Sequence, residues 1–140
     1  MEIADSYPVV VTDSLRECRN FYRERFGFEV AFDSSWFVLV SGGGAHPTSL
    51  AFMHSSHPSS PPDPAQHRGE GSFLTFQVAD ARAEYDRLSE AGAEFALELT
   101  EEPWGQRRFA LTDPAGVWVD VVEQIEPAAG WWDPYLEGSR

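Results

Sequence analysis

Hydrophobic residues in the first half of the chain change their spacing in an order that predicts one strand, one helix and three more strands. The β-branched residues of 6–12 are typical of a strand. Beyond Asp13, the expected N-cap, apolar residues recur at helical spacing as far as Gly27, the expected C-cap: Leu15, Cys18, Tyr22 and Phe26. The stretches that follow predict three strands, at 28–32, 36–40 and 49–53.

The second half of the chain repeats this order. A strand is predicted at 72–78, Asp80 is the expected N-cap of a helix, and Gly92 closes that helix. Three more strands follow, the last two joined by a tight Asp-Pro-Ala-Gly turn, at 95–99, 107–112 and 117–122. The pattern therefore predicts an α+β fold of two tandem βαβββ modules, at about 5–54 and 71–124.

Two stretches fall outside the modules. Residues 55–70 are rich in Ser, Pro and His and have no apolar period, which predicts a flexible linker, with a lid over a pocket as the alternative. Residues 126–140 form a tail whose rings are expected to pack on the body of the protein or on a second subunit: Trp131, Trp132 and Tyr135. Residues 1–125 are expected to form a single domain, which suits a chain of 140 residues.

The chain is strongly acidic, with a formal net charge of −13, and its ten basic residues are all Arg. This charge repels nucleic acids and anionic membranes and attracts cationic small molecules, although it can also serve solubility alone. No apolar run approaches the roughly 20 residues that span a bilayer, and the acidic N-terminus lacks the features of a signal peptide. Cys18, the sole cysteine, is expected in the core, and the absence of an internal disulfide suits a cytoplasmic protein.

Two sets of residues resemble a known superfamily. The sequence PWGQRRFALTDPAG at 103–116 resembles the bleomycin-resistance family in its Trp-Gly start, its Phe-Ala-Leu segment and its Asp-Pro-x-Gly turn. The region of the first helix resembles that of the wider glyoxalase, or vicinal oxygen chelate, superfamily. The resemblance rests on Val11, Asp13 and Leu15, followed by Phe21-Tyr22 and Phe26-Gly27-Phe28. With the duplicated modules, the resemblance covers residues 6–123. It implies a cup-shaped mixed sheet with the helices on its outer face, and commonly a dimer.

Enzymes of this superfamily hold a divalent metal by His and Glu residues from four strands. The resemblance shows which residues of this sequence stand at those four positions. Alignment places the four positions at Ser6 or Tyr7, near Ala51, at Ser72 or Phe73, and at Asp120. Asp120 alone is a ligand type, whereas a catalytic metal needs about three protein ligands. All four histidines lie in predicted loops: His46, His54, His57 and His67. A metal site formed by His54, His57 and His67 would have to order a flexible segment, which costs conformational entropy. We therefore expect neither a metal nor another cofactor.

Asp120 is the centre of the predicted pocket. If Val119 and Val121 face the helix, Asp120 faces the cup together with Trp118. A carboxylate in an aromatic cup can pair with an amine or guanidinium, and that contact strengthens where water is excluded. The alternative is that Asp120 forms only a surface salt bridge.

The pairing of the last two strands decides which side chains accompany Asp120. A tight hairpin places Asp120 opposite Phe109 and brings Arg107 to the same face of the sheet. Leu111 would share that face with Arg107, and a slip of one residue would replace Arg107 and Leu111 by Arg108 and Ala110.

Aromatic residues complete the predicted pocket. Trp36 and Trp104 begin strands at its edge, and Phe52 and Phe73 are candidates for its floor, with plain core packing as the alternative for all four. The predicted ligand-binding set contains no catalytic and no metal-binding residue: Trp36, Phe52, Phe73, Trp104, Arg107, Phe109, Trp118 and Asp120.

These observations favour a metal-free binding protein that sequesters a small aromatic or cationic compound such as a natural-product antibiotic, and that forms a homodimer. The resemblance leaves open a second function, an enzyme of the lyase, isomerase or dioxygenase kind with a degenerate metal site. A third is an interaction module whose aromatic tail docks a partner. Sequestration is preferred over catalysis because the metal positions lack ligands.

Overall fold

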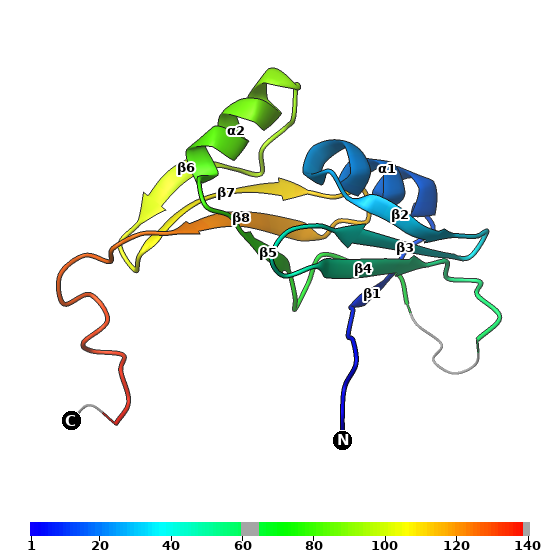
Figure 1. Ribbon diagram of the computed structural model, residues 1–140, viewed down its shortest axis with the longest axis horizontal. Coiled ribbons are helices and arrows are strands. Elements are labelled where there is room, and N and C mark those ends of the chain that lie inside the picture. Colours follow the sequence, from blue (N-terminus) through cyan, green and yellow to red (C-terminus); the bar gives the residue numbers. More distant parts are fainter. Residues whose placement is uncertain (60–64, 139–140) are drawn as a thin grey trace. The chain divides into compact units, whose positions relative to one another are not determined.

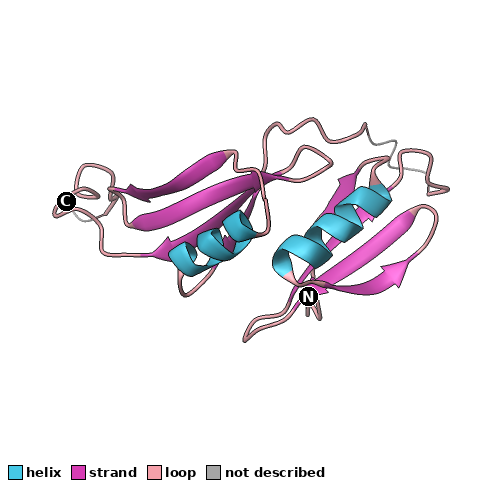
Figure 2. Cartoon of the chain, turned by 90° about the horizontal axis from the view of Figure 1, so that it is seen from above, coloured by secondary structure: helices cyan, strands magenta, loops and turns pink. Residues whose placement is uncertain are grey.

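The structure is a computed structural model that describes residues 1–59 and 65–138. Two four-stranded sheets are each crossed on one face by a single helix (Figures 1 and 2). The elements, in chain order, are β1 (Val9–Val11), α1 (Leu15–Phe26), β2 (Glu29–Asp33), β3 (Phe37–Gly42), β4 (Thr48–Met53), β5 (Leu74–Gln77), α2 (Ala81–Glu90), β6 (Leu97–Glu102), β7 (Gln106–Thr112) and β8 (Trp118–Gln124). The predicted α+β class and its two tandem βαβββ modules are confirmed.

The two sheets share one topology. Their strand orders are β1-β4-β3-β2 and β5-β8-β7-β6, in which the first strand of each module runs parallel to the last and the other pairs are antiparallel. Each outer hairpin also carries a register shift, between Val30 and Phe32 in the first sheet and between Leu97 and Thr100 in the second. Such irregularities strengthen the local twist of an edge strand.

One predicted N-cap is confirmed and the other is wrong. Oδ1 of Asp80 accepts a hydrogen bond from the backbone N–H of Ala83 at 3.0 Å, as expected of the residue that caps α2. In the first module, however, Ser14 is the N-cap of α1. The carboxylate of Asp13 instead accepts from the backbone N–H and the hydroxyl of Ser55, at 3.1 and 2.6 Å, a partner 42 residues away in the chain.

Aromatic rings join each helix to its sheet. In the first module, the rings of Tyr22 on α1 and Phe52 on β4 lie 5.5 Å apart and are fully buried. Cys18 lies in the same core, as predicted, and burial raises the pKa of its thiol. In the second module, the ring of Phe109 on β7 lies 5.5 Å from that of Tyr85 on α2.

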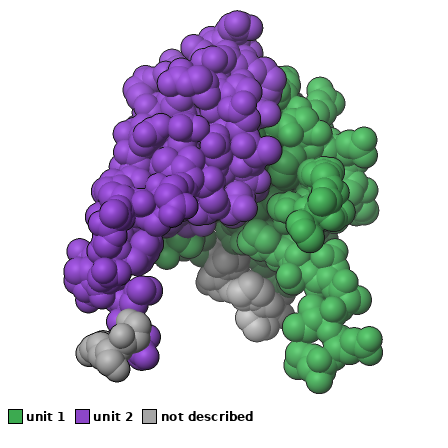
Figure 3. Space-filling view, turned by 60° about the vertical axis from the view of Figure 1, so that its left-hand side comes forward, with its two compact units in different colours: residues 1–72, 113–117 green, residues 73–112, 118–140 purple. Residues whose placement is uncertain are grey.

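The chain divides into two compact units, which Figure 3 colours separately. Unit 1 contains residues 1–72 and 113–117, and unit 2 contains residues 73–112 and 118–140. The turn that joins β7 to β8 therefore belongs to unit 1. Its Asp113 accepts a hydrogen bond from the hydroxyl of Tyr22 at 2.6 Å and others from the backbone N–H groups of Ala115 and Val117.

The predicted linker is anchored to unit 1 at its described C-terminal part. The backbone N–H of His67 donates to the carbonyl of Val11 at 2.8 Å, and the side chain of Gln66 bonds to Asp13. The central residues of that linker, 60–64, lie outside the described residues. Within the described part of the chain, no helix is both long and apolar enough to cross a bilayer.

Candidate functional site

The face of the second sheet that lies away from α2 carries most of the predicted pocket. Val121 pairs with Phe109, whose ring contacts Tyr85 of α2, so this pair faces the helix. Because successive side chains of a strand point to opposite faces, Trp118 and Asp120 point the other way. The predicted orientation of Asp120 relative to the valines of β8 thus follows from the register. We call this surface the polar face.

The register of β7 and β8 differs by one residue from the tight hairpin that was expected. Asp120 pairs with Ala110, and Phe109 pairs with Val121, so the pairing of Asp120 with Phe109 is wrong. The reason is that Val117 belongs to the turn, where its carbonyl accepts from the backbone N–H of Asp113 at 2.9 Å. One extra turn residue shifts every pair by one position and reverses the face of each side chain.

This shift changes which arginine accompanies Asp120. Arg107 faces the helix side, where its guanidinium bonds to Glu101 at 2.6 Å and to Glu123 at 3.0 Å. Arg108 lies on the polar face instead, as the alternative register required. Arg107 and Phe109, both predicted ligand contacts, are therefore on the opposite side of the sheet from Asp120.

Charged side chains form a connected cluster on the polar face. Nη1 of Arg108 donates to Oδ2 of Asp120 at 3.1 Å, and Nη2 of Arg108 lies 2.8 Å from Oε2 of Glu102. Nε1 of Trp118 donates to Oδ1 of Asp120 at 2.6 Å. Burial opposes the charge of Arg108, but the hydrogen bonds and charges of Glu102 and Asp120 outweigh it and raise the pKa of the guanidinium.

Two tryptophan rings, those of Trp104 and Trp131, lie beside this cluster. The guanidinium carbon of Arg108 lies 5.5 Å from the ring centre of Trp104, which suits a cation–π contact. Nε1 of Trp104 donates to Oε1 of Gln106 at 2.9 Å, and the ring of Trp131 lies 5.8 Å away. The contribution of Trp131 was missed, because its position 27 residues beyond Trp104 follows no strand or helix period.

The remaining predicted pocket residues lie elsewhere in their units. Phe52 is fully buried against Tyr22 on the helix side of the first sheet, so it is a core residue and not a pocket floor. Trp36 is 37% exposed and meets Phe37 edge to face. Phe73 is 60% exposed and directly precedes β5. The structure thus brings together Trp104, Trp118 and Asp120 and adds Arg108 and Glu102 to them.

The corresponding face of the first sheet is mostly apolar, with Glu29, Ser41 and Ser49 as its polar residues at one end. Val38 on β3 pairs with Phe52 on β4, and the ring of Phe52 contacts Tyr22 of α1, so this pair faces the helix. The residues next to them on each strand therefore point to the opposite face, away from α1. Phe32 and Phe37 lie there with ring centres 6.3 Å apart, and Phe32 is 55% exposed. We call this surface, which also holds Val9, Val11, Leu39, Ala51 and Met53, the apolar face.

The side chains on these faces do not fit a divalent metal. On the apolar face Val9 pairs with Ala51, and neither side chain has a donor atom. On the polar face Thr75 pairs with Asp120, whose carboxylate is already bound to a guanidinium and an indole. Across residues 1–59 and 65–138, no three side chains of His, Cys, Asp or Glu gather as metal ligands would. The donor set falls short of the three that a catalytic metal requires.

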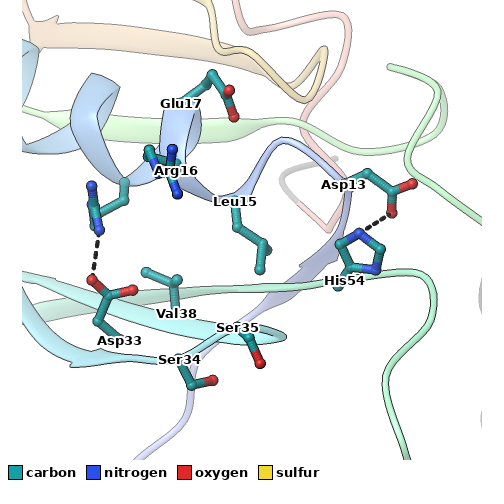
Figure 4. A pocket seen from close by; sticks show the side chains of 10 residues that line it. Asp13, Leu15, Arg16, Glu17, Asp33, Ser34, Ser35, Val38 and His54 are labelled. Carbon is teal, nitrogen blue, oxygen red and sulfur yellow. Dashed lines mark hydrogen bonds and ion pairs between the residues drawn. The ribbon is translucent and has the colours of Figure 1, made fainter.

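A separate cleft of about 460 Å³ opens in unit 1 beside the start of α1 (Figure 4). Leu15 and Val38 form its apolar floor, and Ser34 and Ser35 line the side formed by the β2–β3 turn. Sequence reasoning missed this cleft because its lining comes from four segments that share no motif.

The titratable groups of the cleft are mostly engaged with one another. Nε2 of His54 lies 3.4 Å from Oδ1 of Asp13, and its Nδ1 bonds to the hydroxyl of Ser56 at 2.7 Å. Nη1 of Arg19 donates to Oδ2 of Asp33 at 2.6 Å. The cleft therefore combines an apolar floor with these paired groups and with the carboxylate of Glu17, which also lines it.

Comparisons with known proteins agree with this architecture. The family model of the Glyoxalase/Bleomycin resistance protein/Dioxygenase superfamily matches residues 6–121. The chain is 32% identical over 111 residues to YurT of Bacillus subtilis (strain 168), an alignment that spans 74% of this chain and 86% of YurT.

Solved structures with the same arrangement include a glyoxalase/bleomycin resistance protein/dioxygenase from Nocardioides. It aligns with a TM-score of 0.73 at 20% identity, over 90% of this chain and 86% of that chain. Lactoylglutathione lyase from Agrobacterium tumefaciens aligns with a TM-score of 0.67 at 21% identity, over 86% of this chain and 92% of that chain. At these identities the likeness concerns the fold.

Proposed function

Because the chain belongs to the glyoxalase/bleomycin resistance protein/dioxygenase superfamily, we propose that it binds a small aromatic or cationic molecule on the polar face and sequesters it unchanged. A natural-product antibiotic is the class of ligand that this function implies. The proposal places the protein with the metal-free, bleomycin-resistance type of the superfamily.

The observation that carries the proposal is the state of Asp120. Its side chain is 6% exposed and is held by Arg108 and Trp118, beside the ring of Trp104. A metal ligand needs its oxygen lone pairs directed at the ion, whereas these oxygens accept from a guanidinium and an indole. What the polar face offers instead is ring surface for a flat molecule, together with carboxylate oxygens that can take a further donor.

The charge of the cluster favours a cationic ligand. Two carboxylates, Glu102 and Asp120, share one guanidinium, Arg108, so one negative charge is left over. A ligand amine or guanidinium would balance that charge while its ring lies against an indole. The net charge of −13 would speed the approach of such a cation, in a manner that salt weakens.

We also propose that two copies associate through the apolar face. Phe32 and Val9 are 55% and 43% exposed there. Exposed apolar surface of this kind is typical of a contact between proteins. A homodimer would cover these side chains and leave the polar face to the ligand.

Isothermal titration tests the binding function, with metal-free bleomycin and the flat cation proflavine as probes and the flat anion fluorescein as the comparison. We expect at least one cation to bind, more weakly at high salt, and fluorescein not to bind. Asp120→Asn should weaken that binding about tenfold, in the range of a lost charged hydrogen bond. The matched control is Asp86→Asn on the exposed surface of α2, which changes the net charge equally.

Two results would contradict the proposal. One is the absence of binding heat for both cations at low salt. The other is a stoichiometric divalent metal in protein purified without chelators that is lost in Asp120→Ala, since this would make the polar face a metal centre.

A further inference from the structure

The C-terminal segment, residues 125–136, passes beside the turn between β6 and β7 and then runs on to the C-terminus, as the orange and red end of Figure 1 shows. The backbone N–H of Ile125 donates to the carbonyl of Gly105, and that of Ala128 donates to the carbonyl of Pro103, both at 2.9 Å. Nε1 of Trp132 donates to the carbonyl of Trp104 at 2.8 Å. The segment is therefore tied to all three residues of this turn.

Gly105 allows this close approach. Its φ is +108°, and a Cβ at this position would lie 2.9 Å from the carbonyl oxygen of Ile125. Any other residue would push the segment away from the turn or strain the backbone. Trp104 and Gly105, the Trp-Gly pair of the motif at 103–116, thus form the surface against which the C-terminal segment packs.

Rings continue this attachment into the polar face. The ring of Trp131 lies 5.1 Å from that of Tyr135 on one side and 5.8 Å from that of Trp104 on the other. Trp104 in turn lies 5.5 Å from the guanidinium carbon of Arg108, which binds Glu102 and Asp120. Adjacent rings and one cation therefore connect the C-terminal segment to the charged cluster.

We propose that Trp131 is a positioning residue for the polar face: it fixes the ring of Trp104, and Trp104 holds Arg108 between Glu102 and Asp120. The hydrogen bond of the Trp104 indole goes to Gln106, the first residue of β7, and this single bond at the ring edge does not by itself fix the tilt of the ring plane. Packing against Trp131 removes that freedom. Only the effect on ligand affinity rests on the proposed function, because the effect on Arg108 exists without a ligand.

The first test uses the unliganded protein. In proton–nitrogen NMR spectra, the Nε–H signal of Arg108 and the indole signal of Trp118 report on the cluster, and Arg108→Lys and Trp118→Phe assign them. We expect Trp131→Ala to shift both signals, as the ring of Trp104 moves, and Trp131→Phe to restore most of the shift. Tyr85→Phe, on α2 at the opposite side of the same sheet, is the control and should leave both signals in place.

The outcome that would overturn the proposal is an unchanged Arg108 signal in Trp131→Ala. If that variant does not fold, Tyr135→Ala replaces it, because this ring is 63% exposed and its truncation tests the same stack. A shift that Trp131→Phe fails to restore would also contradict a role based on ring packing.

The second test measures affinity for proflavine. We expect Trp131→Ala to weaken binding about fivefold, the size of one exposed cation–π contact, and Tyr85→Phe on α2 to leave it unchanged. Unchanged affinity in Trp131→Ala, with wild-type binding intact, would show that the segment does not serve the site. Failure of the wild-type protein to bind would count against the proposed function alone, since the NMR signals decide the positioning role independently.

Discussion

The two sheets share one topology but present opposite chemistry on the faces that point away from their helices. In unit 1, Val9 on β1 lies beside Ala51 on β4, whereas the same pair of strands in unit 2 places Thr75 beside Asp120. The neighbouring residues extend the contrast, from Phe32 and Phe37 in one face to Arg108 in the other. The two modules thus share a backbone arrangement, while the outward residues of each strand decide what a face can bind.

The two units also differ in how each holds a buried carboxylate. Asp113 in unit 1 and Asp120 in unit 2 are each 4% exposed and only seven positions apart. Asp113 is held by uncharged donors, the hydroxyl of Tyr22 and two backbone N–H groups, and burial raises its pKa in spite of them. Asp120 is held by the cation Arg108. A carboxylate with a cationic partner should therefore depend on that partner more than one bound by neutral groups.

The largest effect is expected for Arg108→Met. Removal of the guanidinium leaves Asp120 and Glu102 close together without a cation, and Asp120 is almost fully buried. The free energy of unfolding, measured in urea, should fall by about 2 kcal/mol, which is less than for a fully buried pair because Arg108 is partly exposed. Arg87→Met, which breaks the exposed pair with Glu84 on α2, is the matched control and should cost much less. Equal losses of unfolding free energy in Arg108→Met and Arg87→Met would contradict the greater dependence of the buried Asp120 on its cation.

A smaller effect, with a defined pH dependence, is expected for Asp113→Asn. Because the folded pKa of Asp113 is raised above its ordinary value of 3.8, the folded protein binds this proton more tightly than the unfolded chain. The resulting stability is fully present below pH 3.8 and is lost as the pH rises through the folded pKa. Urea unfolding from pH 3.5 to 7 should show the wild type losing stability relative to Asp113→Asn as the pH rises. A wild type that gains stability relative to Asp113→Asn as the pH rises would contradict the raised pKa of Asp113.

The smallest effect on folding is expected for Phe32→Thr on the apolar face. Since the ring is 55% exposed, the free energy of unfolding should change by less than about 0.5 kcal/mol. If the apolar face joins two copies, however, sedimentation should show a shift from dimer toward monomer. Arg25→Gln, a polar change on α1, serves as the comparison. A dimer that persists unchanged in Phe32→Thr would exclude this face as the contact.

Much of the fold followed from local signals. The order of elements could be predicted because apolar spacing and turn residues mark each helix and strand, and Asp80 caps its helix with a group three residues away. Asp13 failed as a cap because Ser55, far along the chain, takes its carboxylate. Local pattern thus predicts an element, whereas a competing partner from another segment does not appear in that pattern.

The candidate site was less predictable, and one residue explains most of the error. Val117 reads as the first position of an alternating strand, yet it completes the turn, so Arg108 and not Arg107 joins Asp120. Because side chains alternate with a period of two, a single added turn residue exchanges the two faces. Trp131 was unpredictable for another reason, since its contact with Trp104 depends on how a segment without regular structure returns to a turn.

The assignment of the β7–β8 turn to unit 1 bears on how this gene could be divided. A fragment that encodes only the second βαβββ repeat would carry Asp113 but leave Tyr22 behind, and its hairpin would lose the hydroxyl that satisfies a buried carboxylate. The two halves share one topology, yet they are not interchangeable parts. Such interlocking would favour inheritance of the pair as a whole over the shuffling of single halves.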